Sequence, residues 1–335
     1  MAVLVTGAAG FIGFHTAKRL LARGENVVGL DNLNDYYAVQ LKMDRIERLS
    51  KHGQRAFTFL HCDFADHEAL TTALKQHDID RVIHLGAQAG VRYSLTHPQV
   101  YIQSNLVGHL NILEYCRYNR TCRHLVYASS SSVYGTNPLP GSGFSVADRV
   151  DHPVSLYAAT KKSDELMSEA YSHLYRLPQT GLRFFTVYGP WGRPDMAMWL
   201  FTDAILAGRP IHVFNNGDMR RDFTYIDDIV TGVVSCMDNP PPDDGKEKAG
   251  GSVNPHRVYN IGNHRSEHLM RMIEVLEESL GKKAQKVFRP MQDGDVRETF
   301  ADIGAIQRDL GFSPTTPIEV GIPGFVDWYR DYHGI

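Results

Sequence analysis

The sequence predicts an α/β protein built on a doubly wound parallel sheet, with a smaller, interleaved α/β domain. Two observations carry this prediction. Short apolar runs alternate with helical stretches through the first half of the chain, which is the pattern of a parallel sheet covered by helices. After about residue 180 the rhythm loosens, and prolines, glycines and aromatic residues become frequent, which indicates a second, less regular unit.

Each predicted element of the first half rests on hydrophobic periodicity. The first predicted helix places Phe14, Ala17 and Leu21 on one face, and a glycine follows as a stop signal. The predicted strands are 2–7, 26–31, 57–63, 80–87, 124–130 and 180–189. The predicted helices between them are 11–24, 65–77, 105–119 and 157–175. A sheet wound in this way binds its ligand at the carboxyl ends of the strands.

The two units are predicted to be interleaved, because a strand–helix pattern resumes at 220–237. The first domain is predicted at 1–180, with a returning segment at about 222–262. The second domain is predicted to be formed mainly by 181–335.

Composition argues against several classes of function. The chain of 335 residues has a net charge of −3 and no block of like charges, which disfavours a nucleic-acid or polybasic membrane surface. It starts without a basic, cleavable leader, and no apolar run reaches the roughly 18 residues that span a bilayer. The four cysteines show no paired spacing and are expected to be reduced thiols of a cytoplasmic protein. His264 and His268 lack the order of a zinc motif and a third ligand, so no metal site is predicted.

A glycine-rich turn opens the first helix directly after the first strand. Gly7, Gly10 and Gly13 let the backbone approach a pyrophosphate, and the helix N-terminus supplies free N–H groups. Asp31 ends the second strand, where a carboxylate accepts hydrogen bonds from a ribose hydroxyl and repels a 2′-phosphate. These residues predict a Rossmann dinucleotide site that prefers NAD to NADP. Asp63 ends the third predicted strand and is expected to reach the adenine edge or, alternatively, to cap the next helix.

A serine, a tyrosine and a lysine are spaced as in a hydride-transfer centre. Tyr157 and Lys161 lie four residues apart at the start of a predicted helix and therefore face the same way. Ser130 ends the fifth predicted strand, at the edge where the cofactor is expected. Oxidation of an alcohol needs a base, and a tyrosine with an ordinary pKa of about 10 becomes one beside positive charges such as an ammonium and a nicotinamide. These three residues are therefore the predicted catalytic set.

In these motifs the chain resembles the extended short-chain dehydrogenase/reductase family over nearly its whole length. The stretches TGAAGFIG, HLGAQ and RRDFTYIDD carry the general resemblance. The stretches AQAGVRYS, ASSSSVYG and RFFTVYGPWGRPDM carry a closer similarity to its UDP-glucuronate 4-epimerases. The resemblance implies bound NAD, an NAD-binding first domain and a second domain that binds a UDP-sugar. It also implies a homodimer formed through the helices at 105–119 and 157–175.

The resemblance also carries individual residues over to the two sites. The NAD-binding positions are Gly7, Gly10, Phe11, Ile12, Gly13, Asp31, Asn32, Asp63, Phe64, Leu85, Ala87, Gln88, Asn105, Tyr157, Lys161, Phe185 and Val187. The substrate-binding positions are Ser130, Ser131, Tyr157, Thr186, Arg193 and Arg221. Two positions depart from the family pattern, since Gly86 stands where alanine is usual and Arg297 where proline is frequent.

The predicted reaction is the reversible C4 epimerisation of UDP-glucuronate to UDP-galacturonate through a transient 4-keto sugar. Tyr157 would take the proton of the C4 hydroxyl while hydride passes to NAD, and the keto sugar would turn before the hydride returns. This intermediate is a β-keto acid that loses CO2 unless its carboxylate is held out of alignment. Arg193 and Thr186 are the predicted clamp, because arginine binds carboxylates through paired N–H donors. Arg92 is a second candidate for substrate binding, and a loop-pinning ion pair is the alternative for each arginine.

Three alternative functions stay open. The main one is 4-epimerisation of UDP-glucose or another neutral UDP-sugar. A UDP-glucuronate decarboxylase or a dehydratase is disfavoured, because Ser131 and Ser132 stand where those relatives carry an acid. A protein that senses the dinucleotide without catalysis is disfavoured by the intact Tyr157 and Lys161.

Overall fold

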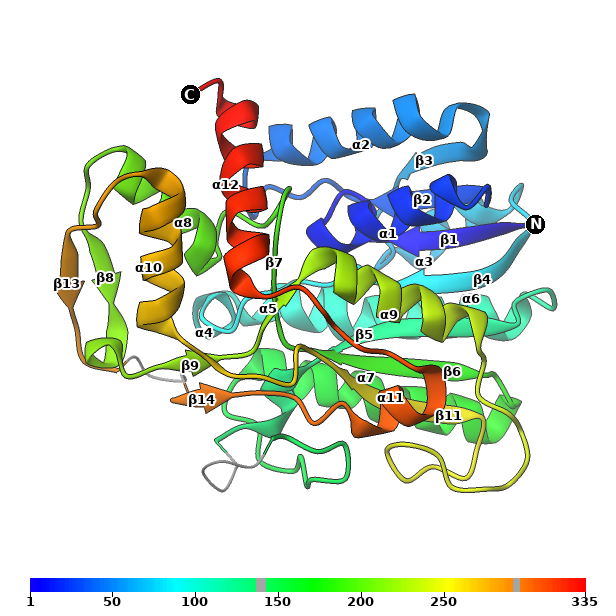
Figure 1. Ribbon diagram of the computed structural model, residues 1–335. Coiled ribbons are helices and arrows are strands. Elements are labelled where there is room, and N and C mark those ends of the chain that lie inside the picture. Colours follow the sequence, from blue (N-terminus) through cyan, green and yellow to red (C-terminus); the bar gives the residue numbers. More distant parts are fainter. Residues whose placement is uncertain (137–142, 292–295) are drawn as a thin grey trace.

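A parallel seven-stranded sheet forms the centre of the computed structural model, which describes residues 1–136, 143–291 and 296–335. Its strand order is β11-β6-β5-β4-β1-β2-β3 (Figure 1). The strands are β1 (Ala2–Thr6), β2 (Val27–Asp31), β3 (Phe57–His61), β4 (Ile79–His84), β5 (His124–Ser130), β6 (Gln179–Phe184) and β11 (His256–Ile261). From β1 the chain builds outward to β3 on one side, and then from β4 to β11 on the other, which is the crossover of a doubly wound sheet. The predicted fold class is confirmed.

Helices cover both faces of this sheet because its strands alternate their side chains. Val3 and Val5 of β1 are buried in one core cluster, and Leu4 between them is buried in another. One face is covered by α1 (Phe11–Ala22), α2 (Val39–Gly53) and α9 (Ile226–Asp238), as Figure 1 shows. The opposite face is covered by α3 (His67–Leu74), α6 (Gly108–Tyr118) and α7 (Leu156–Tyr175).

The helix predicted at 105–119 starts earlier in the structure and changes its winding. After α4 (Tyr93–Thr96), the segment α5 (Pro98–Tyr101) leads into a π-helical stretch, η2 (Ile102–Val107), and then into α6. Single π turns inside helices are frequent at functional sites. Here the π turn contains the buried Asn105, which reaches the cavity wall described below.

The prediction of one continuous strand at 180–189 is wrong. This segment is divided into β6 and β7 (Thr186–Tyr188), and only β6 belongs to the central sheet. At the break, the Phe185 amide still donates to the Ile261 carbonyl at 3.2 Å, whereas the Thr186 amide donates to the Asp222 carbonyl at 3.2 Å. From there β7 pairs in parallel with β10 (Phe223–Tyr225). A continuous apolar run does not reveal such a change of partner, because both strands are buried.

A smaller lobe with its own core lies beyond the carboxyl ends of the sheet, on the left in Figure 1. Its elements are α8 (Ala197–Leu206), β8 (Ile211–Val213), β9 (Arg220–Arg221), β12 (Glu267–His268), α10 (Leu269–Leu280), β13 (Lys286–Phe288), β14 (Glu298–Thr299) and α12 (Ile318–His333). The chain returns to the sheet through α9 and β11, and α11 (Gly304–Leu310) also packs against β11. Within the described ranges, no helix combines the length and apolarity needed to cross a bilayer.

Candidate active site

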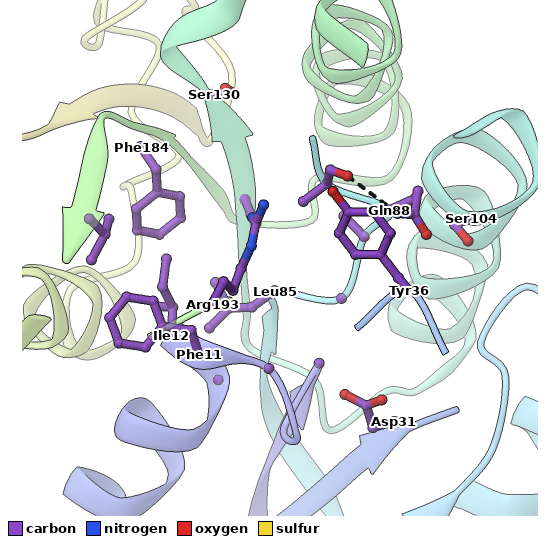
Figure 2. Close-up of a pocket in the computed structure, with 18 of the residues that line it drawn as sticks. Phe11, Ile12, Asp31, Tyr36, Leu85, Gln88, Ser104, Ser130, Phe184 and Arg193 are labelled. Carbon is purple, nitrogen blue, oxygen red and sulfur yellow. Dashed lines mark hydrogen bonds between the residues drawn. The ribbon is translucent and has the colours of Figure 1, made fainter. Parts of the chain in front are cut away.

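A cavity opens at the carboxyl ends of the central strands, which is where this topology places a ligand (Figure 2). Its walls come from the turn after β1, the ends of β2, β4 and β5, the start of α7 and the chain after β6. The predicted site residues that line it are Gly7, Gly10, Phe11, Ile12, Gly13, Asp31, Asn32, Phe64, Leu85, Ala87, Gln88, Ser130, Tyr157, Lys161, Phe185, Val187 and Arg193. The fold thus brings most of the predicted positions to one place.

The turn after β1 has the shape of a diphosphate cradle. Gly7 adopts a φ of +69°, and a Cβ on Gly13 would approach the Gly7 carbonyl oxygen to 2.0 Å. Gly10 precedes α1, and no side chain caps the first N–H groups of this helix. These groups and the positive end of the helix dipole therefore remain available to a bound anion.

Asp31 ends β2 at the cavity wall, and two backbone N–H groups hold its carboxylate. Its Oδ2 accepts from the Ala9 amide at 3.1 Å, and its Oδ1 accepts from the Leu33 amide at 2.9 Å. Burial raises the pKa of this carboxyl, and the two backbone hydrogen bonds oppose that rise. The carboxylate is thus tied both to the phosphate turn and to the loop that follows β2.

Asp63 does not cap α3, which removes the alternative considered for it. The cap is Asp66, whose side chain accepts from the Ala69 amide at 3.0 Å. Asp63 is exposed and accepts from Asn32 Nδ2 at 3.0 Å. Since Asn32 itself lines the cavity, Asp63 is linked to the cavity wall through this bond.

The departure at Gly86 is explained by Phe64. A Cβ at position 86 would meet Cε1 of the Phe64 ring at 2.5 Å. The opposite edge of the same ring packs on Gly108, where a Cβ would meet Cε2 at 2.4 Å. The ring therefore occupies the space that an alanine at position 86 would need.

Replacing Gly86 by alanine is expected to destabilise the protein by about 1–3 kcal/mol, the usual range for overpacking. Either the Phe64 ring or the strand end beside the cofactor must move, so NAD binding is expected to weaken as well. Thermal unfolding with and without NAD measures both effects. Phe64→Leu replaces the ring by a smaller side chain. The Gly86→Ala/Phe64→Leu double variant should therefore lose less stability than the sum of the two single losses. Strict additivity of the two losses would contradict the explanation.

Ser130, Tyr157 and Lys161 all line the cavity. Ser130 is the last residue of β5, and its Oγ accepts from the Ser132 amide at 3.1 Å. Ser155 caps α7 by accepting from the Ala158 amide at 3.1 Å, which places Tyr157 in the first turn and Lys161 one turn further on. The strand end and the capped helix thus direct the three side chains to one region.

A buried ion pair that was not predicted from the sequence holds α7 against the sheet. Arg183 of β6 donates to Glu165 of α7 from Nε at 2.8 Å and from Nη2 at 2.9 Å. Ser129, the neighbour of Ser130, donates to the same carboxylate at 2.7 Å. Burial alone would raise the pKa of Glu165, but its bonds and charge pairing with Arg183 outweigh burial and lower the pKa to about 2. The sequence offers two weak signals, since an arginine interrupts an apolar strand and a glutamate follows Lys161 by four residues.

Asn105 supports the cavity wall from behind and does not line the cavity. Its Oδ1 accepts from the Gln88 amide at 2.8 Å, and its Nδ2 donates to the Gln88 carbonyl at 3.2 Å. Nδ2 also donates to Thr160 Oγ1 at 3.0 Å, which links the strand end to α7. Asn105 therefore fixes the position of Gln88, which is the residue that faces the cofactor space.

Arg193 projects into the cavity from the loop after β7, as Figure 2 shows. Its Nε and Nη2 donate to the two carboxylate oxygens of Asp195 at 2.9 and 2.5 Å. The Tyr36 hydroxyl donates to the same carboxylate at 3.0 Å. One edge of the guanidinium is therefore used by Asp195, and among the described residues no hydrogen bond from Nη1 occupies the other edge, which is available to a ligand. Arg193 combines the loop-pinning ion pair, considered above as its alternative, with a place in the cavity.

The loop that carries Arg193 is fastened to the phosphate turn by Arg45, which was also not predicted. Arg45 is a fully buried residue of α2. Its Nη1 donates to the Ala9 carbonyl at 2.8 Å, and its Nη2 donates to the carbonyls of Trp191 and Gly192 at 2.6 and 3.0 Å. One side chain thus sets the position of the Arg193 loop relative to the dinucleotide cradle.

Four predicted substrate residues lie outside the cavity lining. Thr186 opens β7 and borders a small adjoining pocket together with Arg193. Ser131 begins the short helical turn η3 (Ser131–Tyr134). Arg92 lies over the Phe214 ring at 5.6 Å from its centroid. Arg221 of β9 donates to the Arg297 carbonyl at 3.2 Å, so the second departure from the family pattern lies beside it.

Comparison with known proteins agrees with this arrangement. Residues 3–262 match the NAD dependent epimerase/dehydratase family. The chain is 47% identical to the probable UDP-glucuronate 4-epimerase of Rhizobium meliloti (strain 1021), over 98% of this chain and 97% of that protein. It is 45% identical to UDP-glucuronate 4-epimerase 1 of Arabidopsis thaliana, over 100% of this chain and 78% of that protein.

Among solved structures, the UDP-glucuronic acid 4-epimerase of Bacillus cereus in complex with UDP-glucuronic acid and NAD superposes with a TM-score of 0.87. It is 33% identical in sequence, and the match covers 99% of this chain and all of the other. The family match extends over most of the length, and the two relatives match 98% and 100% of this chain. The chain therefore belongs to the NAD dependent epimerase/dehydratase family.

Proposed function

We propose that this protein is an NAD-dependent isomerase that interconverts UDP-glucuronate and UDP-galacturonate by epimerisation at C4. The observation that carries the proposal is the meeting of a dinucleotide cradle, the Ser130, Tyr157 and Lys161 set, and the Arg193 guanidinium in one cavity. The relatives named UDP-glucuronate 4-epimerases, and the solved structure that holds UDP-glucuronic acid and NAD, support the same reaction.

NAD fits the residues that are present. The glycine turn leaves space that a Cβ would fill, and Asp31 holds a carboxyl at the ribose position, where it disfavours a 2′-phosphate. When bound, NAD supplies the chemistry of accepting hydride from C4 of the sugar and returning it. The chain's own residues therefore have to handle the proton and orient the sugar.

Proton transfer is assigned to Tyr157, with Ser130 orienting the same C4 hydroxyl. The Lys161 ammonium is held by the Ala128 carbonyl at 2.9 Å and by Asp164 at 3.1 Å, and it lies one helical turn from the tyrosine. In general, a positive charge beside a tyrosine favours the tyrosinate over the neutral phenol. Because the same proton and hydride return to the sugar, the reaction consumes neither acid nor redox equivalents.

Retention of CO2 is assigned to Arg193 and, beside it, Thr186. The bond to CO2 breaks readily only when it overlaps the π system of the C4 carbonyl. A carboxylate held by the free edge of the guanidinium keeps that bond away from this alignment. Ser131 and Ser132 offer no carboxyl group that would assist an elimination.

Product analysis of the purified protein tests the proposal. UDP-galacturonate formed from UDP-glucuronate would support it. UDP-xylose or a 4-keto pentose would indicate a decarboxylase, and faster turnover of UDP-glucose would indicate the neutral-sugar epimerase. No turnover of either substrate would leave a dinucleotide-binding protein without this activity.

Replacing Arg193 by alanine is expected to lower kcat/KM for UDP-glucuronate about 30-fold or more and to raise the share of pentose product. The magnitude corresponds to the loss of about 2 kcal/mol or more on truncating one partner of a desolvated charge pair. Chromatography of the UDP-sugars measures both quantities. Arg209→Ala, which removes an exposed arginine of the small lobe that pairs with Asp203, is the matched control. Unchanged epimerisation with no pentose would contradict the clamp.

A homodimer through α6 and α7 is also part of the proposal. Large apolar side chains stay exposed on these helices in the single chain, among them Leu110 at 39%, Leu166 at 59% and Leu174 at 63%. Apolar surface on adjoining helices suits a symmetric helix–helix interface. Sedimentation equilibrium, which measures the mass in solution, tests it.

The proposal also covers the cellular location and the division into domains. All four cysteines are free thiols, which supports a reducing, cytoplasmic location. We also propose two domains. An NAD-binding domain comprises 1–180 with a returning segment at about 222–262, and a UDP-sugar domain is formed mainly by 181–335. Limited proteolysis, with mapping of the cleavage sites, tests that boundary.

A further inference from the structure

A buried carboxyl group lies directly beside Lys161, outside the cavity lining. Asp164 is one helical turn further along α7, and its Oδ2 accepts from Lys161 Nζ at 3.1 Å. Both side chains are buried, with 3% of Lys161 and 1% of Asp164 exposed. The charge of Asp164 therefore acts on Lys161 with little screening from water.

Asp164 is poorly compensated as an anion. Its Oδ1 is buried and has no hydrogen-bond partner in the part of the chain that the structure describes. A buried carboxylate with only one ionic bond is easily protonated, because desolvation disfavours its charged form. Burial raises the pKa of Asp164 to about 7, although the Lys161 ammonium opposes that rise.

The other titratable groups around this pair are neutral or already paired. On the same helix, Glu165 belongs to the Arg183 ion pair. His84 of β4 and His109 of α6 are fully buried, and burial lowers the pKa of His84 to about 3 and that of His109 well below its usual value. Burial likewise raises the pKa of the Tyr127 hydroxyl on β5 well above its usual value. At neutral pH, Lys161 is thus the charge that Asp164 can cancel.

We propose that Asp164 is a positioning residue that controls how much of the Lys161 charge reaches Tyr157. When Asp164 is protonated, the ammonium stands uncompensated and favours the tyrosinate. When Asp164 is ionised, the two charges form a neutral pair, and that support is withdrawn. Ionisation of Asp164 therefore opposes ionisation of the tyrosine, and the active form develops at a higher pH than it would beside an uncharged neighbour.

This inference rests on the proposed role of Tyr157 as the base, and the Asp164→Asn variant tests it. Asparagine has nearly the same shape, still accepts from Lys161 and carries no charge at any pH. In the NAD-loaded enzyme, kcat for UDP-glucuronate is measured from about pH 5.5 to about pH 9, where the acid limb reports the base in the bound complex.

The acid limb of the variant is expected to move to lower pH by about 0.5–1 unit, because the variant lacks one buried negative charge on the helix that carries Tyr157. The ratio of variant to wild-type kcat should be near 1 below about pH 6, where the wild-type carboxyl is protonated. It should reach about 3–10 near pH 8. Glu278→Gln, which removes an exposed carboxylate of α10, is the charge-matched control and should leave the profile in place.

A ratio that stays constant with pH, or a limb that moves to higher pH, would overturn the proposal. Asp164→Ala is tested in parallel, so that the result does not depend on the folding of one variant. Ultraviolet titration gives a readout without turnover. The tyrosinate signal of Tyr157 is measured in the NAD-bound wild type and in the NAD-bound Asp164→Asn variant. In each case the signal of the matching protein with Tyr157→Phe is subtracted. If wild type fails to convert UDP-glucuronate, the proposed function fails, while this titration still shows whether Asp164 governs the ionisation of Tyr157.

Discussion

Replacing Tyr157 by phenylalanine is expected to lower kcat for UDP-glucuronate by about 10²–10⁴-fold, the usual contribution of a general acid–base group. The change removes one hydroxyl and keeps the ring. Its edge-to-face contact with Tyr101, at 6.0 Å between centroids, should therefore survive. Stability and NAD binding are expected to stay close to those of wild type, because neither the capped start of α7 nor the glycine turn is altered.

Three measurements on the Tyr157→Phe protein separate chemistry from structure. Chromatography gives kcat, absorbance of the nucleotide released on denaturation gives the NAD content, and thermal unfolding gives the melting temperature. Tyr329→Phe is the matched control, since it removes a hydroxyl that donates to Asp203 at 3.3 Å in the small lobe. A Tyr157→Phe variant that keeps kcat within about a factor of ten of wild type would assign the proton to another group.

The parts of the site that the sequence predicts are those that local spacing encodes. The glycines of the phosphate turn and Asp31 belong to one strand–turn–helix–strand unit, so their relative placement follows from the topology. Tyr157 and Lys161 share one helix. Ser130 ends β5, and only β4 lies between β5 and β1, the strand that leads into the glycine turn. Each of these inferences needs only the element and its place in the sheet.

The parts that the sequence does not predict depend on contacts between distant segments. Arg45 lies in a helix that was not expected, and it bonds to Trp191, 146 residues away. The break between β6 and β7 follows from a change of hydrogen-bond partner, to which the apolar pattern of the run is blind. Asp164 is marked by burial and by an oxygen, Oδ1, that has no partner among the described residues, and neither feature can be read from the residue's neighbours in sequence.

Breaking the ion pair between Glu165 and Arg183 is expected to destabilise the protein more than any other change described here. Glu165→Ala leaves a buried guanidinium without its partner, and such a loss typically amounts to about 3–5 kcal/mol. Urea unfolding measures it. Glu274→Gln, which removes an exposed partner of Arg271, is the control and should change stability by less than about 1 kcal/mol.

The pH dependence of this contribution has a definite sign. The folded-state pKa of Glu165 lies at about 2, below the value of 4.5 for the free side chain, so folding favours the ionised form. The stabilisation is therefore complete above about pH 4.5 and is lost as the pH falls towards 2. Glu165→Gln should remove this part of the acid sensitivity. A loss of less than about 1 kcal/mol at neutral pH for Glu165→Ala would contradict the assignment.

A double variant separates the stabilising role of this pair from its effect on the active site. Replacing both partners by apolar residues of similar size, as in Glu165→Leu/Arg183→Met, removes the unpaired charge and should recover much of the lost stability. The Ser129 hydroxyl, however, loses the carboxylate to which it donates, and it adjoins Ser130 at the end of β5. We therefore expect stability to recover while kcat stays low. That result would mean that the pair positions the catalytic serine and helix α7; recovery of both quantities together would mean that its role is stability alone.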